Sequence, residues 1–96
     1  MKKEMLELRT SEFFKCLSDY SRFKIINALI DGELCVSDIT EKVNMTQTAV
    51  SYQLKLLRSN HLVKYRREGQ NIYYSIDDEH IKQIILIAYE HLMEEE

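Results

Sequence analysis

Apolar residues recur at helical spacing in the first third of the chain and predict two helices there. The first helix contains SEFFKCL, where Ser11 can cap the N-terminus. The second contains SDYSRFKIINALIDG, which Asp19 can cap at its start and Gly32 can close at its end. The apolar stripe of this second helix consists of Phe23, Ile26, Leu29 and Ile30.

Two shorter helical patterns follow within residues 34–60, in ELCVSDITEKVN and TQTAVSYQLKLLRSN. Because so few residues separate the two patterns, the chain must turn sharply between them, as in a helix-turn-helix. The residues expected to face inward are Val36, Ile39, Val43, Val50, Leu54 and Leu57.

Within residues 62–76 the apolar period changes from that of a helix to that of a strand. LVKYRR and NIYYSI are short β-rich runs joined by EGQ, where Gly69 can adopt a positive φ in a turn. Ile72, Tyr74 and Ile76 alternate with the residues between them, which favours a half-buried hairpin. A last helix follows at once. The order of elements predicts a single winged helix-turn-helix domain over residues 1–96, mainly α with a β-hairpin wing.

The chain length of 96 residues suits one domain with a modest core. Apolar residues that one copy of such a domain cannot bury favour a partner chain. No apolar run approaches the roughly 18 residues of a membrane span and no secretory signal is evident, so we expect a cytoplasmic protein that does not contact a membrane. Two cysteines, Cys16 and Cys35, are too few for a disulfide framework.

The net charge of −3 hides an uneven distribution of charge along the chain. Residues 41–70 carry six basic and two acidic side chains, a net charge of +4. Residues 77–96 carry one basic and seven acidic side chains, a net charge of −6. A basic middle and an acidic end indicate different partners for the two regions.

A polar stripe runs along the second helix of the predicted helix-turn-helix, opposite the inward-facing residues. Glutamine and threonine at the start of such a helix suit base edges in a major groove, and its free N–H groups can meet a phosphate. The stripe comprises Gln47, Ser51, Lys55 and Arg58, with Thr46, Thr48 and Tyr52 beside it.

The predicted wing is also basic, since Lys64, Arg66 and Arg67 lead into its EGQN tip. A basic wing beside a reading helix suits contacts with phosphates or with a minor groove. The alternative is an ordinary polar helix face and a solvated hairpin, in which Arg67 pairs only with Glu68. Helix and wing together favour DNA binding. The residues predicted to contact DNA are Thr46, Gln47, Thr48, Ser51, Tyr52, Lys55, Arg66 and Arg67.

The last twenty residues, DDEHIKQIILIAYEHLMEEE, combine an apolar stripe with His80 and His91. In a helix these two histidines lie about 20° apart around the axis and about 16.5 Å apart along it. Two ligands of one Zn²⁺ ion lie only about 3–4 Å apart, since each Zn–N bond is about 2.0–2.1 Å long. One helix therefore cannot bring both histidines to one ion.

Two antiparallel copies of this helix can form such a site. Pairing His80 with His91 of a partner, or Asp78 with Glu94, places the two-fold axis near Ile85 and Leu86 in both cases. Each of two sites then has Asp78 and His80 from one chain and His91 and Glu94 from the other. Two imidazoles and two carboxylates suit Zn²⁺ or Co²⁺, whereas Ni²⁺ prefers more ligands. The alternative is the ordinary polar face of a terminal helix, and we interpret His61 as solvated.

The segments ELCVSDI, TQTAVSYQLKLLRSNHLV and RREGQNIYYSI resemble the ArsR/SmtB family of bacterial metal- and thiol-responsive repressors over nearly the whole chain. Tyr20 stands where the family usually has proline. The spacing Asp-x-His-x10-His-x2-Glu is similar to that of the zinc-sensor branch, whose site lies on the last helix at the dimer interface. The resemblance implies a metal site made of Asp78, His80, His91 and Glu94.

The resemblance also implies a mechanism: a homodimer that binds double-stranded operator DNA when metal-free and dissociates when Zn(II) binds, with Co(II) or Ni(II) as other effectors. Residues 1–17 and 77–96 would be the dimerisation helices. The regulated genes would encode metal efflux or sequestration.

Three alternatives remain open. The first is a repressor that responds to thiol oxidation or to a soft metal through Cys35 and Cys16. The soft-metal branch has a CVC pair where this chain has CVS, so Ser37 replaces the second thiolate. The second is a small zinc hydrolase, which four protein ligands and no open position disfavour, so we expect no enzyme activity. The third is an adaptor that uses the same scaffold to bind a partner.

Overall fold

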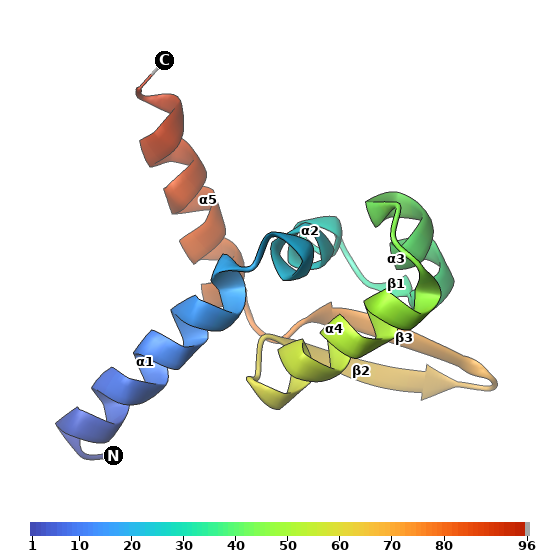
Figure 1. The fold of residues 1–96 in the computed structure, drawn as a ribbon, viewed down its shortest axis with the longest axis horizontal. Coiled ribbons are helices and arrows are strands. Elements are labelled where there is room, and N and C mark those ends of the chain that lie inside the picture. The colour runs from blue at the N-terminus through green and yellow to red at the C-terminus, as the bar shows by residue number, and fades with distance from the viewer. Residues whose placement is uncertain (96) are drawn as a thin grey trace.

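The computed structural model describes residues 1–95, which form five helices and a small three-stranded sheet, with a helix at each end of the chain (Figure 1). This order of elements confirms the predicted mainly helical winged helix-turn-helix. The helices are α1 (Lys3–Ser18), α2 (Tyr20–Ala28), α3 (Val36–Val43), α4 (Gln47–Ser59) and α5 (Glu79–Met93). The strands are β1 (Leu34–Cys35), β2 (Val63–Glu68) and β3 (Asn71–Ile76).

Of the three residues predicted to cap or close the first two helices, which are Ser11, Asp19 and Gly32, only Asp19 does so. Asp19 caps α2 as expected, since its Oδ2 accepts a hydrogen bond of 3.1 Å from the Arg22 backbone N–H. Ser11 is not a cap, because α1 begins at Lys3 and Ser11 lies inside it. The preceding residues KEMLELRT contain good helix formers and neither glycine nor proline, so the helix extends through them. Gly32 does not close α2, whose C-cap is Leu29.

The turn of the helix-turn-helix is held by backbone geometry and one side chain. Asn44 ends α3 in the left-handed conformation, with φ of 54°. Asparagine tolerates this conformation better than most residues. The Thr46 hydroxyl then accepts a hydrogen bond of 3.1 Å from the Ala49 backbone N–H and caps α4. These two residues fix the start of the predicted reading helix.

The sheet has three antiparallel strands in the order β1-β3-β2, one more than the predicted hairpin. The additional strand is the two-residue β1, in which Leu34 pairs with Tyr74 and Cys35 with Tyr73. Gly69, with φ of 63°, forms the turn between β2 and β3 as predicted. Because β3 lies between two strands, its residues 72–76 are all partly buried.

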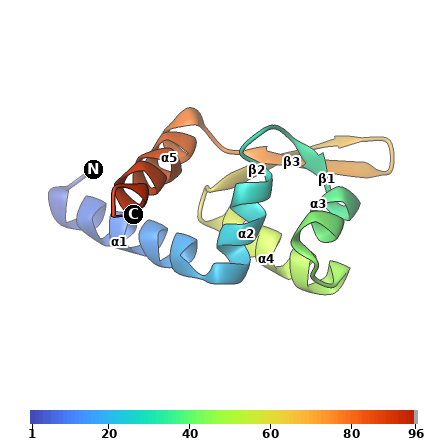
Figure 2. The ribbon, with the colours of Figure 1, turned by 90° about the horizontal axis from the view of Figure 1, so that it is seen from above.

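The core lies between the end of α1, helices α2, α3 and α4, the base of the sheet and the beginning of α5. Its fully buried members include Ile25, Ile26, Ile39, Leu54 and Leu57. Helices α1 and α5 extend from this core at the end opposite the wing tip (Figures 1 and 2). Large apolar side chains remain exposed on both helices; they are Met5, Leu6, Leu8, Phe14, Leu86, Ile87, Leu92 and Met93. In residues 1–95, none of the helices has the length and apolar character of a membrane span.

Candidate DNA-binding surface and C-terminal helix

One face of α4 is buried and the other is open to solvent, as the sequence pattern predicts. Val50, Leu54 and Leu57 are fully buried. All the polar residues predicted to read DNA on this element are exposed; they are Thr46, Gln47, Thr48, Ser51, Tyr52 and Lys55. The structure therefore brings these six residues together on one accessible surface at the start and middle of α4.

The wing tip lies close to the start of α4. Gln47 and Ser51 line a shallow groove together with Cys35 at the start of α3 and with Gln70 and Asn71 at the turn of the wing. A second contact joins the wing to the end of α4, where the Arg58 guanidinium lies 4.7 Å from the centre of the Tyr65 ring. Reading helix and wing thus form one continuous polar surface.

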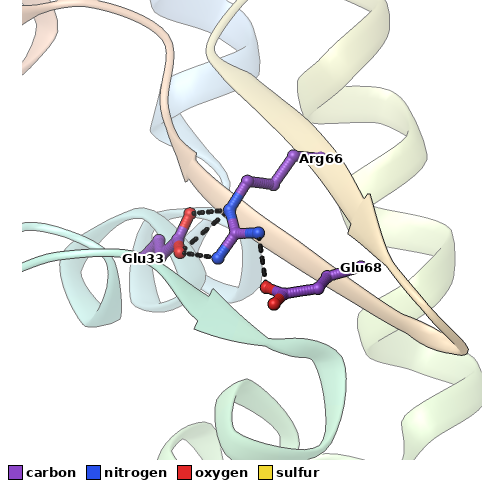
Figure 3. A network of polar contacts seen from close by, with 3 residues as sticks. All are labelled: Glu33, Arg66 and Glu68. Carbon is purple, nitrogen blue, oxygen red and sulfur yellow. Dashed lines mark hydrogen bonds and ion pairs between the residues drawn. The ribbon is translucent and has the colours of Figure 1, made fainter.

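The two wing arginines, both predicted to contact DNA, have different surroundings. The Arg66 guanidinium binds Glu33 and Glu68, at 2.6 Å and 2.7 Å (Figure 3). The hydrogen bond from Arg66 lowers the pKa of Glu33, and the two carboxylates raise the pKa of Arg66. Within residues 1–95, Arg67 takes part in none of the ion pairs, so it is Arg66 and not Arg67 that pairs with Glu68. Sequence spacing could not reveal Glu33 as a partner, since 33 positions separate it from Arg66.

The two cysteines lie on different elements and are both free thiols. Cys16 belongs to the core, as its apolar neighbours in sequence suggest. Burial raises the pKa of its thiol, an effect that nearby Arg22 opposes. The Cys35 sulfur lies 3.3 Å from the Ser37 hydroxyl oxygen. A cage of several thiolates does not form around either cysteine in the described residues.

The four predicted metal ligands occupy the two ends of α5. Asp78 is the N-cap in an extended conformation, so its carboxylate reaches the first turn and accepts a hydrogen bond of 2.9 Å from the His80 backbone N–H. The same Oδ1 lies 3.5 Å from His80 Nδ1. His91 is in the last turn and Glu94 is the C-cap. Within residues 1–95 of one chain, no three metal-binding side chains converge to hold an ion.

The orientation of α5 shows that Ile85 cannot face a partner at the expected two-fold axis. Ile85 was expected to lie at that axis, yet only 1% of its surface is exposed because it packs into the core of its own chain. At about 100° per residue, the face that carries His80 and His91 also carries Ile84 and Ile87, all within about 60° of arc. Ile87 is 63% exposed, whereas Leu86 lies on another face of the helix.

A groove lies between α1 and the start of α5. Leu6, Phe13 and Phe14 of α1 line one side, and Asp78, His80 and Ile84 line the other. His61, with φ of 60°, also borders this groove. The predicted metal ligands Asp78 and His80 thus lie beside the exposed apolar residues of α1.

Comparison with known proteins identifies the family. The family model described as bacterial regulatory protein, arsR family, matches residues 19–65, from α2 into β2. A transcriptional repressor SmtB homolog from Synechocystis is 45% identical over 84 residues, which cover 88% of this chain and 64% of that protein. A cadmium resistance transcriptional regulatory protein CadC homolog from Staphylococcus aureus is 42% identical over 88% of this chain and 70% of that protein. The chain therefore belongs to the ArsR family of bacterial regulatory proteins.

Solved structures agree with this assignment. The homodimeric winged helix-turn-helix DNA-binding domain of a possible ArsR-family regulator from Mycobacterium bovis superimposes with a TM-score of 0.84 and 33% identity. The match covers 94% of this chain and 87% of that one. The structure of Rv0081 from Mycobacterium tuberculosis superimposes with a TM-score of 0.85 at 28% identity, over 97% of this chain and 93% of that one. The family is one of transcriptional regulators, in agreement with the prediction that the chain is not an enzyme.

Proposed function

We propose that the chain is a homodimeric transcriptional repressor that holds operator DNA when metal-free and releases it on binding Zn(II). The observation that carries this proposal is the placement of His80 and His91 on one exposed face of α5, with Asp78 capping the helix beside His80. The chain spans about 64% of the length of the SmtB homolog, so the resemblance supports a function for the part that they share.

The apolar surface of α1 and α5 supports a dimer. The midpoint between Ile84 and Ile87 coincides along the helix with the midpoint between His80 and His91. An antiparallel pairing that sets His80 opposite His91 of the partner subunit therefore also sets Ile84 opposite Ile87. Exposed apolar residues on α1 would extend the buried area beyond α5.

The donor set fits a tetrahedral metal ion. Each site would take Asp78 and His80 from one chain and His91 and Glu94 from the other, a set that suits Zn²⁺ or Co²⁺. The His80 and Asp78 side chains are 85% and 52% exposed, so both are accessible to an ion. Hydrogen bonding occupies Asp78 Oδ1, and Oδ2 has no partner in the described residues. When bound, the ion would cross-link the two α5 helices.

Operator binding is assigned to α4 and the wing. The proposed contacts come from Thr46, Gln47, Thr48, Ser51, Tyr52 and Lys55 on the reading helix and from Arg67 on the wing. In a dimer the two reading helices must match successive major grooves about 34 Å apart. A change in the angle between the α5 helices alters that match. By linkage, DNA must weaken zinc binding by the same factor as zinc weakens DNA binding.

The names of the relatives support a regulatory role for metal. The SmtB homolog is described as a transcriptional repressor, and the CadC homolog as a regulator of cadmium resistance. Neither description decides which metal this chain binds. The donor set of this chain, which has two imidazoles and two carboxylates, favours zinc over the softer cadmium.

The test is binding to a DNA duplex that the metal-free protein selects from a randomised library, with and without Zn²⁺. We expect zinc to weaken binding by about ten-fold or more, since a coupling of about 1.4 kcal/mol corresponds to ten-fold. His91→Ala should bind the same duplex and ignore zinc. Glu90→Ala, a neighbour on another face of α5, is the matched control and should respond as the wild type does. A normal zinc response in His91→Ala would contradict the proposed site.

A further inference from the structure

We propose that Arg66 positions the wing and does not itself contact DNA, and that its neighbour Arg67 supplies the wing's contact with the phosphate backbone. The inference rests on the proposed binding of operator DNA. It separates two adjacent arginines for which the sequence predicts the same role.

Each of the three guanidinium nitrogens of Arg66 makes a hydrogen bond within the chain (Figure 3). Its Nε lies 3.1 Å and 3.0 Å from the two carboxylate oxygens of Glu33, and one terminal nitrogen lies 2.6 Å from Glu33 Oε1. The other terminal nitrogen donates to Glu68 Oε2 at 2.7 Å. The Arg66 Cζ atom lies 4.6 Å from the centre of the Tyr73 ring, over the ring face. All three nitrogens and one face are therefore in use.

These contacts bridge the sheet from one outer strand to the other. Arg66 lies on β2, Tyr73 lies opposite it on the central strand β3, and Glu33 immediately precedes β1. The guanidinium thus passes over β3 and holds the β2 side of the sheet to the segment that enters β1. We call this group of Glu33, Arg66, Glu68 and Tyr73 the wing clamp.

The opposite face of β2 is attached to the reading helix. Tyr65 points to the other side of the strand from Arg66. Its ring lies 5.8 Å from that of Tyr74 and 4.7 Å from the Arg58 guanidinium at the end of α4. With the clamp on one face and Arg58 on the other, the angle between the wing and the reading helix is held from both sides.

Electrostatics oppose a DNA contact by Arg66. One guanidinium in the wing clamp faces two carboxylates, so the cluster carries a net negative charge. Withdrawing Arg66 to meet a phosphate would leave Glu33 and Glu68 unpaired near the DNA backbone. Arg67 is exposed and takes part in no ion pair within residues 1–95. Because successive side chains of a strand point to opposite faces, Arg67 lies on the other face of β2 from Arg66. Its charge is available to a phosphate.

The test measures binding to the library-selected duplex over a range of salt concentrations. We expect Arg66→Lys and Glu33→Gln each to weaken binding by about three- to ten-fold, because neither variant can form the bidentate Arg66–Glu33 ion pair. The salt slope, which is the slope of the logarithm of the binding constant against the logarithm of the salt concentration, should not change. Glu33→Gln removes one negative charge, which by itself would strengthen binding. Arg67→Gln is the matched control on the neighbouring residue and should lower the slope by about 0.9. Thermal unfolding should show that all three variants fold.

Different outcomes overturn different claims. If Glu33→Gln tightens binding, or if Arg66→Lys binds as the wild type does, Arg66 is an ordinary phosphate contact and the positioning role is wrong. If a fourth variant, Arg66→Gln, folds and lowers the salt slope as Arg67→Gln does, the same conclusion holds. If the wild-type protein selects no duplex from the library, the proposed operator binding fails, and this inference fails with it.

Discussion

The Tyr89 hydroxyl donates a hydrogen bond of 2.6 Å to Asn27 Oδ1 and so joins α5 to α2. The Tyr89 ring also meets the Phe23 ring edge-on, with centroids 6.2 Å apart. Around the α5 axis, Tyr89 lies about 160° from His91. The contact that attaches α5 to the core therefore also turns the histidine face outward.

Removing the Tyr89 hydroxyl should cost a small part of the stability. Tyr89→Phe keeps the ring against Phe23 and loses the hydrogen bond, so we expect the free energy of unfolding to fall by about 0.5–1.5 kcal/mol. Chemical denaturation at constant protein concentration measures this change. Tyr20→Phe is the control, because Tyr20 is largely exposed and its hydroxyl makes no hydrogen bond to another group of residues 1–95. An equal loss in both variants would contradict the role given to the Asn27 contact.

Substitutions at Ile85 and Ile87 should separate folding from dimerisation. Ile85→Ala leaves a cavity in the core and should lower the free energy of unfolding by about 2–4 kcal/mol. Ile87→Glu puts a charge into the proposed interface and should raise the dimer dissociation constant by about 100-fold or more. Sedimentation equilibrium measures the dissociation constant. A dimer of Ile87→Glu as tight as that of the wild type would exclude the proposed face.

Mixing two inactive variants should restore metal binding if each site is shared between chains. His80→Ala and His91→Ala each remove one ligand from both sites of their own dimers. A mixed dimer has one site with both histidines and one with neither. Because random mixing makes about half of the dimers mixed, we expect about one tightly bound Zn²⁺ per four protomers. Titration after joint refolding measures this ratio, and no restoration would indicate that the two histidines do not share a site.

The cysteines should be dispensable for the response to zinc. Cys16 is buried and the Cys35 sulfur contacts the Ser37 hydroxyl, and within residues 1–95 of one chain neither thiol belongs to a group of three metal-binding side chains. The variant with Cys16→Ala and Cys35→Ser should release the selected duplex on addition of Zn²⁺ as the wild type does. Loss of the zinc response in this variant would favour the thiol-based alternative.

Alkaline pH should destabilise the wild-type protein through Cys16. Burial raises the pKa of this thiol above 9.0, so the folded state retains a proton that the unfolded state has lost. The contribution of the protonated Cys16 thiol to the free energy of unfolding is fully present below pH 9.0 and is lost as the pH rises through the raised pKa of the folded state. Unfolding free energies of wild type and Cys16→Ala, measured from pH 7 to pH 10.5 or so, should therefore differ by a constant amount until the alkaline end, where only the wild type loses this contribution. Parallel curves over the whole range would show that Cys16 does not titrate differently in the folded state.

Sequence patterns predicted the elements well where one local signal dominated. The apolar period marked α4, whose Val50, Leu54 and Leu57 are fully buried, and the predicted Asp19 cap is present. The start of α1 was missed, because no capping residue marks it and helix propensity alone extends it to Lys3. Strand β1 was also missed, since two residues have no readable period and are extended only because β3 offers hydrogen bonds.

The sequence by itself determined the family of the chain, the winged helix-turn-helix, and the spacing of Asp78, His80, His91 and Glu94, because these depend on residue type and on positions near each other in the chain. The tertiary structure decided which face of α5 is free, since packing buries Ile85 and leaves Ile87 exposed. It also decided the different surroundings of Arg66 and Arg67. A carboxylate 33 positions away reaches Arg66 only once the sheet has formed, and no local pattern encodes that meeting.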